Sequence, residues 1–238
     1  MSIRADEAAY EALNNDLALQ RHVLKANAIW DLPDFHASGG VGRAAGLILN
    51  DWQLSGILTA GSGQTSGFNA SAKYDLTYTY QSHGANVNLT GSPDYAAKIV
   101  YVGDPGKGCS DSPYAQFNTA AVTGPSYNSV GLESGRNVLS SCPDKTVDLS
   151  IARNIKVGGA RRLQVRLDAF NAFNVVVINS RNTTVQYASP TDLTILNSQY
   201  RPDGSLDPNR LKPRNAGFGA ATGAQAMRTL QLQFRFQF

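Results

Sequence analysis

Apolar and polar residues alternate without exception between Leu230 and Phe238, at the end of the chain. Because successive side chains of a β-strand point to opposite faces, one face of this stretch carries only apolar side chains. These are Leu230, Leu232, Phe234, Phe236 and Phe238. About nine to eleven residues suffice for a tilted strand to cross a bilayer. The pattern therefore predicts a transmembrane strand whose phenylalanines face lipid, although a strand of a soluble β-sandwich can alternate in the same way.

The same alternation recurs earlier in the chain, so several strands of one kind are expected. They are residues 22–32, 47–59, 146–157 and 162–170. An arginine on the lipid face costs about 2–4 kcal/mol at the middle of the bilayer, so the polar stripes should face a wet interior. The expected lumen-facing residues are Arg166, Asp168, Gln231, Gln233 and Arg235. Trp30 and Trp52 lie toward the ends of their apolar stripes, where an interfacial aromatic belt is expected.

The connections between the expected strands differ in length in a regular way. Residues 157–161 contain adjacent glycines and predict a tight hairpin turn. Residues 33–46 form a connection of moderate length, whose glycines indicate turns rather than a dinucleotide-binding loop. The two remaining connections, near 62–145 and 174–227, are long, polar and rich in turn residues. Short turns on one side and long loops on the other are typical of outer-membrane barrels. With the C-terminus in the periplasm, both long connections fall outside the cell.

Some parts of this topology stay open. Residues 74–80 alternate like the transmembrane stretches, and residues 97–102 are their expected partner. The two form either an additional membrane hairpin or strands that project above the membrane, and both choices leave the topology unchanged. Residues 1–20 are consistent with a loop or a weak helix. In the second long connection Tyr187, Tyr200 and Asp192 are candidates for ligand contact, although an ordinary role within the loop is favoured.

Composition narrows the classes of function. Charged residues make up 16% of the 238-residue chain, and its net charge of +3 is too small and too dispersed to indicate a nucleic-acid partner. No stretch approaches about 18 consecutive apolar residues, which excludes a transmembrane helix. Residues 1–19 are acidic, where a signal peptide needs a basic start and an apolar core. The three histidines lack a matching nucleophile motif, so we expect no catalytic residue, metal, cofactor or enzyme activity.

The two cysteines, Cys109 and Cys142, lie in a region rich in Gly, Pro, Ser and Asn. An even number of cysteines in an exposed loop fits a disulfide that forms in an oxidising compartment. Two unpaired thiols are the alternative. Redox or zinc chemistry is not indicated, because the cysteines have no C-x-x-C spacing and no neighbouring histidine. We therefore expect Cys109 and Cys142 to pair.

A series of short motifs spans nearly the whole chain. They are residues 21–25, 30–33, 52–57, 62–63, 116–121, 135–137, 148–154, 166–174 and the terminal aromatic strand. In this order the motifs resemble the C-terminal barrel portion of TonB-dependent outer-membrane transporters, specifically the Oar-like group with carboxypeptidase-regulatory-like N-terminal domains. The resemblance implies an all-β fold, namely an antiparallel transmembrane β-barrel segment of about five to seven meandering strands. It also implies location in the bacterial outer membrane.

The resemblance further implies a function and partners. Such a protein takes up a ligand, here an unidentified extracellular one, with energy that a TonB complex transmits through an N-terminal plug. No counterpart of that plug is found in this sequence. The aromatic end of such proteins resembles the signal that the barrel-assembly machinery reads, which assigns this role to the five apolar residues of the terminal strand. Outer-membrane lipid is the remaining expected partner.

Residues 21–238 are accordingly expected to be the C-terminal strands of a receptor-type barrel, and not a complete barrel. The barrels of this family resemble plugged transporters of about 22 strands. An open sheet of about five strands leaves two edges with unpaired backbone groups in lipid, so a fragment of a longer protein is expected. Two alternatives stay open. One is an outer-membrane adhesion or surface-binding barrel without active transport, and the other is a soluble carbohydrate-binding β-sandwich.

Overall fold

The chain divides into two compact units in the computed structural model, which describes residues 22–36, 39–63, 73–82, 84–85, 89, 98–125, 127 and 139–238. The first, here called the sheet unit, consists of His22–Gly61, Asp144–Val176 and Ala226–Phe238. The second, here called the connection unit, contains Ser62–Pro143 and Val177–Gln225. Residues 1–20, expected to be a loop or a weak helix, lie outside the described residues.

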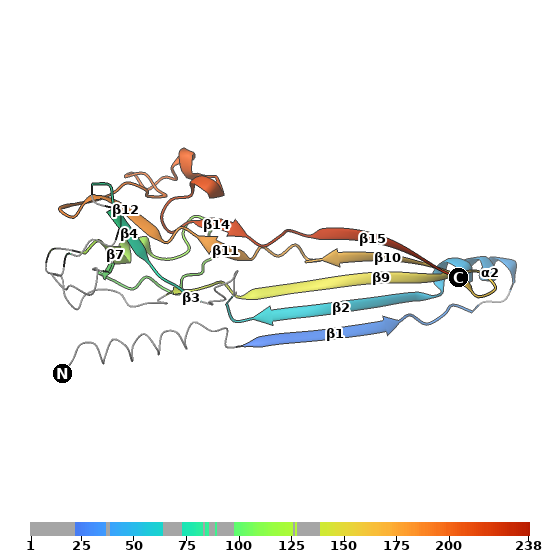
Figure 1. Ribbon diagram of the computed structural model, residues 1–238. Helices are drawn as coiled ribbons and strands as arrows, with labels where there is room; N and C mark the ends of the chain where they lie inside the picture. Colours follow the sequence, from blue (N-terminus) through green and yellow to red (C-terminus); the bar gives the residue numbers. More distant parts are fainter. Residues whose placement is uncertain are drawn as a thin grey trace, which may run out of the picture. The chain divides into compact units, whose positions relative to one another are not determined.

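One five-stranded antiparallel sheet makes up the sheet unit (Figure 1). Its strands are β1 (Val23–Asp31), β2 (Trp52–Gly61), β9 (Asp144–Gly158), β10 (Arg161–Phe170) and β15 (Thr229–Gln237). Their order in the sheet is β1-β2-β9-β10-β15, which is also their order along the chain. The predicted meander and its strands are therefore confirmed. The sheet is not closed, because β1 and β15 lie at its two edges.

The register of the sheet aligns the apolar stripes of all five strands on one face. Trp30 pairs with Leu54, Leu54 with Ile151, Ile151 with Leu167, and Leu167 with Leu232. Paired residues of antiparallel strands point to the same side of a sheet, so this row crosses one face from edge to edge. We call it the apolar face. The opposite side, the polar face, carries the residues expected to be lumen-facing, which are Arg166, Asp168, Gln231, Gln233 and Arg235.

Two connections join neighbouring strands at the same end of the sheet. Between β9 and β10 the chain turns through Gly158 and Gly159, whose φ angles of 117° and 60° suit glycine, as the predicted hairpin requires. Between β1 and β2 it forms the helix α2 (Gly40–Leu49). The prediction of turns followed by a strand from residue 47 was wrong here. Three consecutive apolar residues, 47–49, fit neither face of an alternating strand, and the strand begins after Asp51, whose φ is 62°.

The two long connections, predicted to be polar and rich in turn residues, also contain short strands. They contribute a four-stranded sheet of order β13-β12-β4-β5 and three strand pairs, β3-β8, β6-β7 and β11-β14. The strands are β3 (Lys73–Tyr74), β4 (Thr77–Tyr80), β5 (Gly84–Ala85), β6 (Val100–Tyr101), β7 (Val122–Thr123), β8 (Leu139–Ser140), β11 (Ile178–Arg181), β12 (Thr184–Ser189), β13 (Asp192–Ile195) and β14 (Ala221–Ala224). Three short 3-10 helices complete the unit: η1 (Thr119–Ala121), η2 (Pro208–Arg210) and η3 (Pro213–Asn215).

The expected pairing of residues 74–80 with 97–102 does not occur. Instead β4 pairs in parallel with β12, and β6 pairs with β7. The tyrosines of β4 therefore belong to the connection unit and not to a membrane hairpin. A parallel pair between segments so far apart in sequence leaves no local signal, since parallel strands need a long crossover connection.

The core of the connection unit is aromatic. Tyr78, Tyr80 and Tyr187 are buried, with ring centroids 5.1 Å apart for the first two and 6.2 Å apart for Tyr80 and Tyr187. Tyr80 donates its hydroxyl proton to the Pro125 carbonyl at 2.9 Å, which satisfies a polar group inside the core. The preference for Tyr187 as an ordinary loop residue missed this role.

A disulfide joins Cys109 and Cys142 beside this core, as the sequence suggested. The Arg181 guanidinium lies 4.6 Å from the Tyr74 ring centroid and 3.4 Å from the Cys142 sulfur. Tyr74 donates a hydrogen bond to the Gly108 carbonyl, next to the other cysteine. Burial lowers the pKa of Arg181 and raises that of Tyr74. The disulfide thus links the segment next to Gly108 to the segment that follows β8.

Candidate functional site

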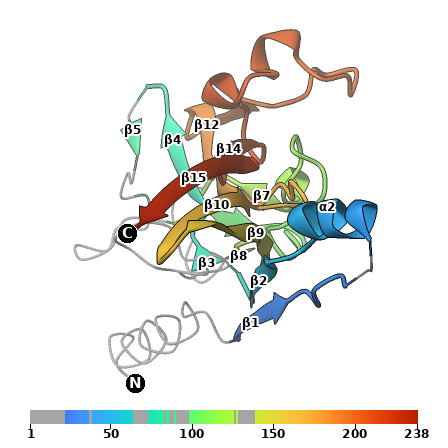
Figure 2. The same ribbon diagram turned by 90° about the vertical axis from the view of Figure 1, so that its right-hand side faces the viewer.

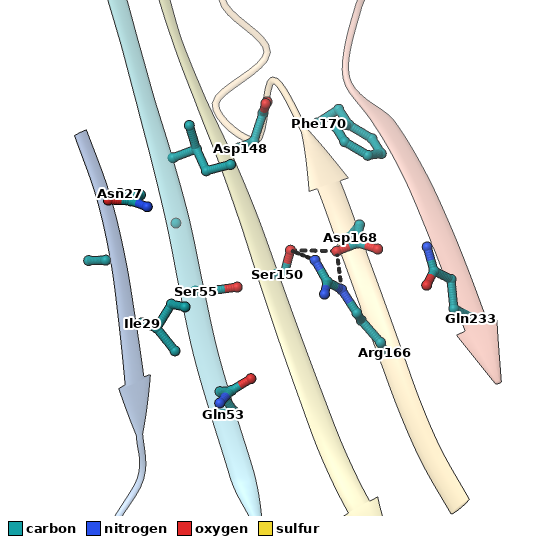
Figure 3. A pocket seen from close by; sticks show the side chains of 13 residues that line it. Asn27, Ile29, Gln53, Ser55, Asp148, Ser150, Arg166, Asp168, Phe170 and Gln233 are labelled. Carbon is teal, nitrogen blue, oxygen red and sulfur yellow. Dashed lines mark hydrogen bonds and ion pairs between the residues drawn. The ribbon is translucent and has the colours of Figure 1, made fainter. Parts of the chain in front are cut away.

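A group of interacting side chains occupies the middle of the polar face, on β9 and β10. Ser150 and Asp168 stand opposite each other in the register, while Arg166 is paired with the small residue Ala152. That leaves room for the Arg166 side chain to lean along the sheet toward Asp168, where its Nε lies 2.7 Å from the carboxylate (Figure 3). Arg166 also donates to the Ser150 hydroxyl at 3.1 Å, and Ser150 donates to the same carboxylate oxygen. The sequence named two of these residues and missed Ser150.

The Asp168 carboxylate is buried, whereas the Arg166 guanidinium that pairs with it is half-exposed. The side chain of Asp168 is 5% exposed and that of Arg166 is 43% exposed. A buried carboxylate is stable only with charge and hydrogen-bond partners, which Arg166 and Ser150 supply. Because the Arg166 guanidinium is partly exposed, solvent screens its attraction to the Asp168 carboxylate. One oxygen of the Asp168 carboxylate thus accepts bonds from both partners, whereas Arg166 still presents donors to anything that lies on the polar face.

A hollow of about 480 Å³ lies over this group and extends across all five strands. Side chains from every strand contribute to it, for example Asn27 of β1, Gln53 and Ser55 of β2, and Gln233 of β15 (Figure 3). The lining mixes uncharged amides and hydroxyls, which both donate and accept hydrogen bonds, with charged and apolar side chains, namely Asp148, Arg166, Asp168, Ile29, Ile57 and Phe170. Such a surface suits a polypeptide or another polar partner better than a single small anion or cation.

The polar face is a candidate binding surface, because it combines a hollow with side chains that form hydrogen bonds. Its serine, Ser150, donates to the Asp168 carboxylate, which also pairs with Arg166. Among the described residues, no group of three or more His, Cys, Asp or Glu side chains is positioned to hold a metal ion. A search of the same residues finds no helix long and apolar enough to cross a membrane.

The motif at residues 166–174 also builds the rim of the sheet, at the end opposite the hairpin turn. Asn171 adopts a φ of 48° and bonds Val175 twice, through its side-chain amide to the carbonyl at 2.8 Å and its side-chain oxygen to the N–H at 2.9 Å. Its backbone N–H donates to the Asp148 carboxylate of β9 at 2.8 Å. Asn174, with a φ of 54°, accepts a hydrogen bond from the Arg228 N–H at 3.0 Å. These two asparagines link the ends of β9, β10 and β15.

The apolar face is interrupted by two cations, both on β9, which the sequence reading did not identify. Lys145 pairs with Ala60, and Arg153 pairs with Trp52, so both share the face of Val147, Leu149 and Ile151. They are about 26 Å apart along the strand at about 3.3 Å per residue, or about 20 Å across the bilayer once the usual strand tilt is included. The alternation itself places them there, with the apolar Val147, Leu149 and Ile151 between them.

Trp30 and Trp52 lie on the apolar face near the hairpin-turn end, at the positions expected for an interfacial belt. Trp30 is exposed, whereas Trp52 is half-buried and donates its indole N–H to the Ile48 carbonyl at 2.8 Å. The Arg153 guanidinium stands 5.5 Å from the Trp52 ring centroid. The residues expected to form the assembly signal occupy the apolar face of the edge strand β15, and all are exposed: Leu230, Leu232, Phe234, Phe236 and Phe238.

The sequence profile of the outer membrane beta barrel domain matches residues 7–231. The chain belongs to this family. The outer membrane beta barrel domain is thus located in the bacterial outer membrane, where the strands of a barrel turn apolar side chains toward lipid and polar ones toward the interior. Contact with lipid explains why the apolar side chains of the sheet, including the phenylalanines of the domain's last strand, are exposed. Neither the curated proteins nor the solved structures contain a match to this domain.

Proposed function

We propose that this domain is the C-terminal part of a TonB-dependent outer-membrane receptor that takes up an unidentified ligand. The observation that carries the proposal is the polar face, which runs across all five strands and offers amides, hydroxyls and the half-exposed Arg166. In a receptor of this class, the lumen holds a plug domain, and the plug needs such a hydrogen-bonding wall. The motif order in the sequence supports the same assignment.

The open sheet agrees with this proposal. Unpaired backbone groups at the edges of a sheet cost several kcal/mol each in hydrocarbon, so β1 and β15 both require further strands as neighbours. A receptor barrel of about 22 strands supplies them. Ligand would then enter from the side of the two long connections, and energy from the inner-membrane TonB complex would reach the site through the plug.

Site-specific photocrosslinking in the outer membrane of the producing bacterium tests the proposal. A photoreactive amino acid at Gln233, on the polar face, should crosslink to an N-terminal plug of the same polypeptide. The matched control is Leu232, the neighbouring residue on the apolar face, which should crosslink to no plug. The genomic DNA upstream of Met1 should encode that plug, a signal peptide and further strands in one reading frame.

An adhesion or surface-binding barrel is the second candidate, and the connection unit favours it. That unit has its own buried aromatic core and a disulfide, which suit a rigid surface for contact with other proteins or cells. In this case the reading frame would contain no plug, and binding would persist in cells that lack the TonB complex. Membership in an outer-membrane family argues against the soluble carbohydrate-binding sandwich.

A further inference from the structure

The helix α2 presents apolar side chains to its surroundings and not to the protein. Val41 is 87% exposed and Ile48 is 65% exposed, and Leu47 and Leu49 are exposed as well. Val41 and Ile48 lie on one stripe, because positions seven apart in a helix share a side. On the other side, a Cβ at Gly46 would lie 3.3 Å from the Asn50 side chain and 3.5 Å from the Phe35 carbonyl. The helix therefore contacts its own connection through Gly46 and turns its apolar stripe away.

Two residues of the apolar face, Trp52 and Arg153, donate hydrogen bonds to carbonyls at the C-terminal end of α2. The Trp52 indole donates to the Ile48 carbonyl at 2.8 Å, and the Arg153 Nε donates to the Asn50 carbonyl at 3.1 Å. A second nitrogen of the Arg153 guanidinium donates to the Leu47 carbonyl. The last carbonyls of a helix have no partner within the helix, so these bonds satisfy them. They also set the position of α2, since Trp52 and Arg153 both point to the lipid side of the sheet.

The helix lies at the end of the sheet that carries the hairpin turn, as Figure 2 shows for the end nearest the viewer. Short turns of outer-membrane barrels face the periplasm. Tryptophan and arginine are stable at the level of lipid headgroups, where an indole contacts acyl chains and a guanidinium meets phosphate. Trp52 and Arg153 thus mark the periplasmic boundary of the bilayer, and α2 ends at that boundary.

We propose that α2 is an interfacial helix that lies in the periplasmic leaflet of the outer membrane, with Val41, Ile48 and Leu49 among the phospholipid acyl chains. The partner is phospholipid because the apolar stripe ends beside Trp52, which itself stands on the lipid-facing side of the sheet. A stripe of this kind is the usual feature of helices that lie in the plane of a membrane. Arg153 has two roles here: it donates hydrogen bonds to carbonyls at the end of α2, and it places its charge at headgroup level. The inference rests on the outer-membrane location and not on ligand transport.

Spin-label accessibility in vesicles of phosphatidylethanolamine and phosphatidylglycerol tests this inference. The protein, purified from outer membranes and reconstituted, carries a nitroxide at Ile48→Cys or, as a second position, Val41→Cys. Both native cysteines are bonded to each other, so only the introduced thiol reacts. The collision rate with oxygen, which concentrates in lipid, should exceed that with a water-soluble nickel chelate several-fold. The matched control is His36→Cys, an exposed position in the same connection, which should show the reverse.

Each other outcome overturns the inference. A label at Ile48 that meets the nickel chelate as often as the His36 label would place α2 in water. A label shielded from both reagents would place it against a periplasmic protein or a second copy of the chain. A further label at Leu232→Cys reports the apolar face itself, and its failure to contact lipid would remove the basis of the inference. Lipid contact at Leu232 without lipid contact at Ile48 would refute only the role of α2.

Discussion

The sheet unit and the connection unit place their large apolar side chains in opposite environments. In the sheet unit Phe234 is 67% exposed, and so are Leu230, Leu232 and Phe236 of the same strand. In the connection unit Leu139 is 0% exposed, within a cluster that includes Phe117 and Phe218, whose ring centroids lie 5.3 Å apart. The first arrangement is stable only when lipid covers the apolar face, and the second excludes water by its own packing. The sheet unit is therefore stabilised by lipid, and the connection unit by the packing of its own side chains.

This difference also changes what a substitution does. On the sheet, the face on which a residue stands decides whether a charge is tolerated, and its neighbours in space matter less. In the connection unit the volume and the hydrogen bonds of a buried side chain decide how much a substitution destabilises the fold, since interiors are close-packed. Substitutions in matched pairs can separate these two rules.

The largest effect is expected for Phe234→Arg. It places a guanidinium on the lipid-facing stripe of the terminal strand, where a charge costs up to about 2–4 kcal/mol depending on its depth, and removes a phenylalanine from that strand. We expect loss of the heat-modifiable, membrane-assembled form in gel electrophoresis of outer-membrane fractions. Gln233→Arg is the control, because its side chain stands on the polar face. Normal heat-modifiable migration of the Phe234→Arg protein would contradict the lipid-facing assignment.

Alkaline pH should unfold the connection unit alone. Burial raises the pKa of Tyr187 to about 12 and also raises the pKa of Tyr74 and Tyr80 above the usual value of about 10. A group with a raised pKa in the folded state stabilises the fold below its unfolded pKa, and this contribution is lost as the pH rises through its folded pKa. The connection unit should therefore lose protease resistance between about pH 10 and 12.

The sheet unit contains no tyrosine, so it provides the internal control. Over the same pH range the assembled form should keep its heat-modifiable migration. Ultraviolet absorbance of tyrosinate should show late-titrating tyrosines until the connection unit unfolds. Tyrosines that all titrate near pH 10 in a protease-resistant protein would show that the aromatic core is not buried.

Leu139→Ala should destabilise the connection unit by about 2–5 kcal/mol, because it leaves a cavity in a fully buried position. Leu211→Ala, at an exposed position of the same unit, should change stability by less than about 0.5 kcal/mol. Limited proteolysis in urea measures both variants against the parent. Equal protease sensitivity of the two variants would mean that the buried cluster does not stabilise the unit.

Removal of the disulfide should have the smallest effect of the four. Cys109 and Cys142 are separated by 33 positions, and closure of such a loop stabilises a fold by about 2–4 kcal/mol. The Cys109→Ser, Cys142→Ser double variant should show greater protease sensitivity in the connection unit and unchanged assembly of the sheet. Mass spectrometry should find no alkylated thiol in the parent without reductant. Alkylation of both cysteines under those conditions would refute the disulfide.

Most of the sheet unit could be predicted from the sequence. Most positions of its strands alternate with a period of two, because lipid and the polar interior impose opposite requirements on their two faces. The same period also assigns Arg153 and Lys145 to the apolar face, although the sequence reading overlooked them. Ser150 lay on a predicted polar stripe, but its contact with Asp168 depends on the register between β9 and β10.

Tertiary structure decided the remaining features, and in each case a contact between distant residues is the reason. The helix α2 ends where Trp52 and Arg153 bind its carbonyls, and Arg153 lies far along the chain from the helix. The parallel pair β4-β12 brings the Thr77 hydroxyl to 2.7 Å from that of Thr184. The sequence alone determined which side chains face lipid, because one periodic requirement repeats along each strand. The connection unit has no such period, since a packed core depends on which segments meet.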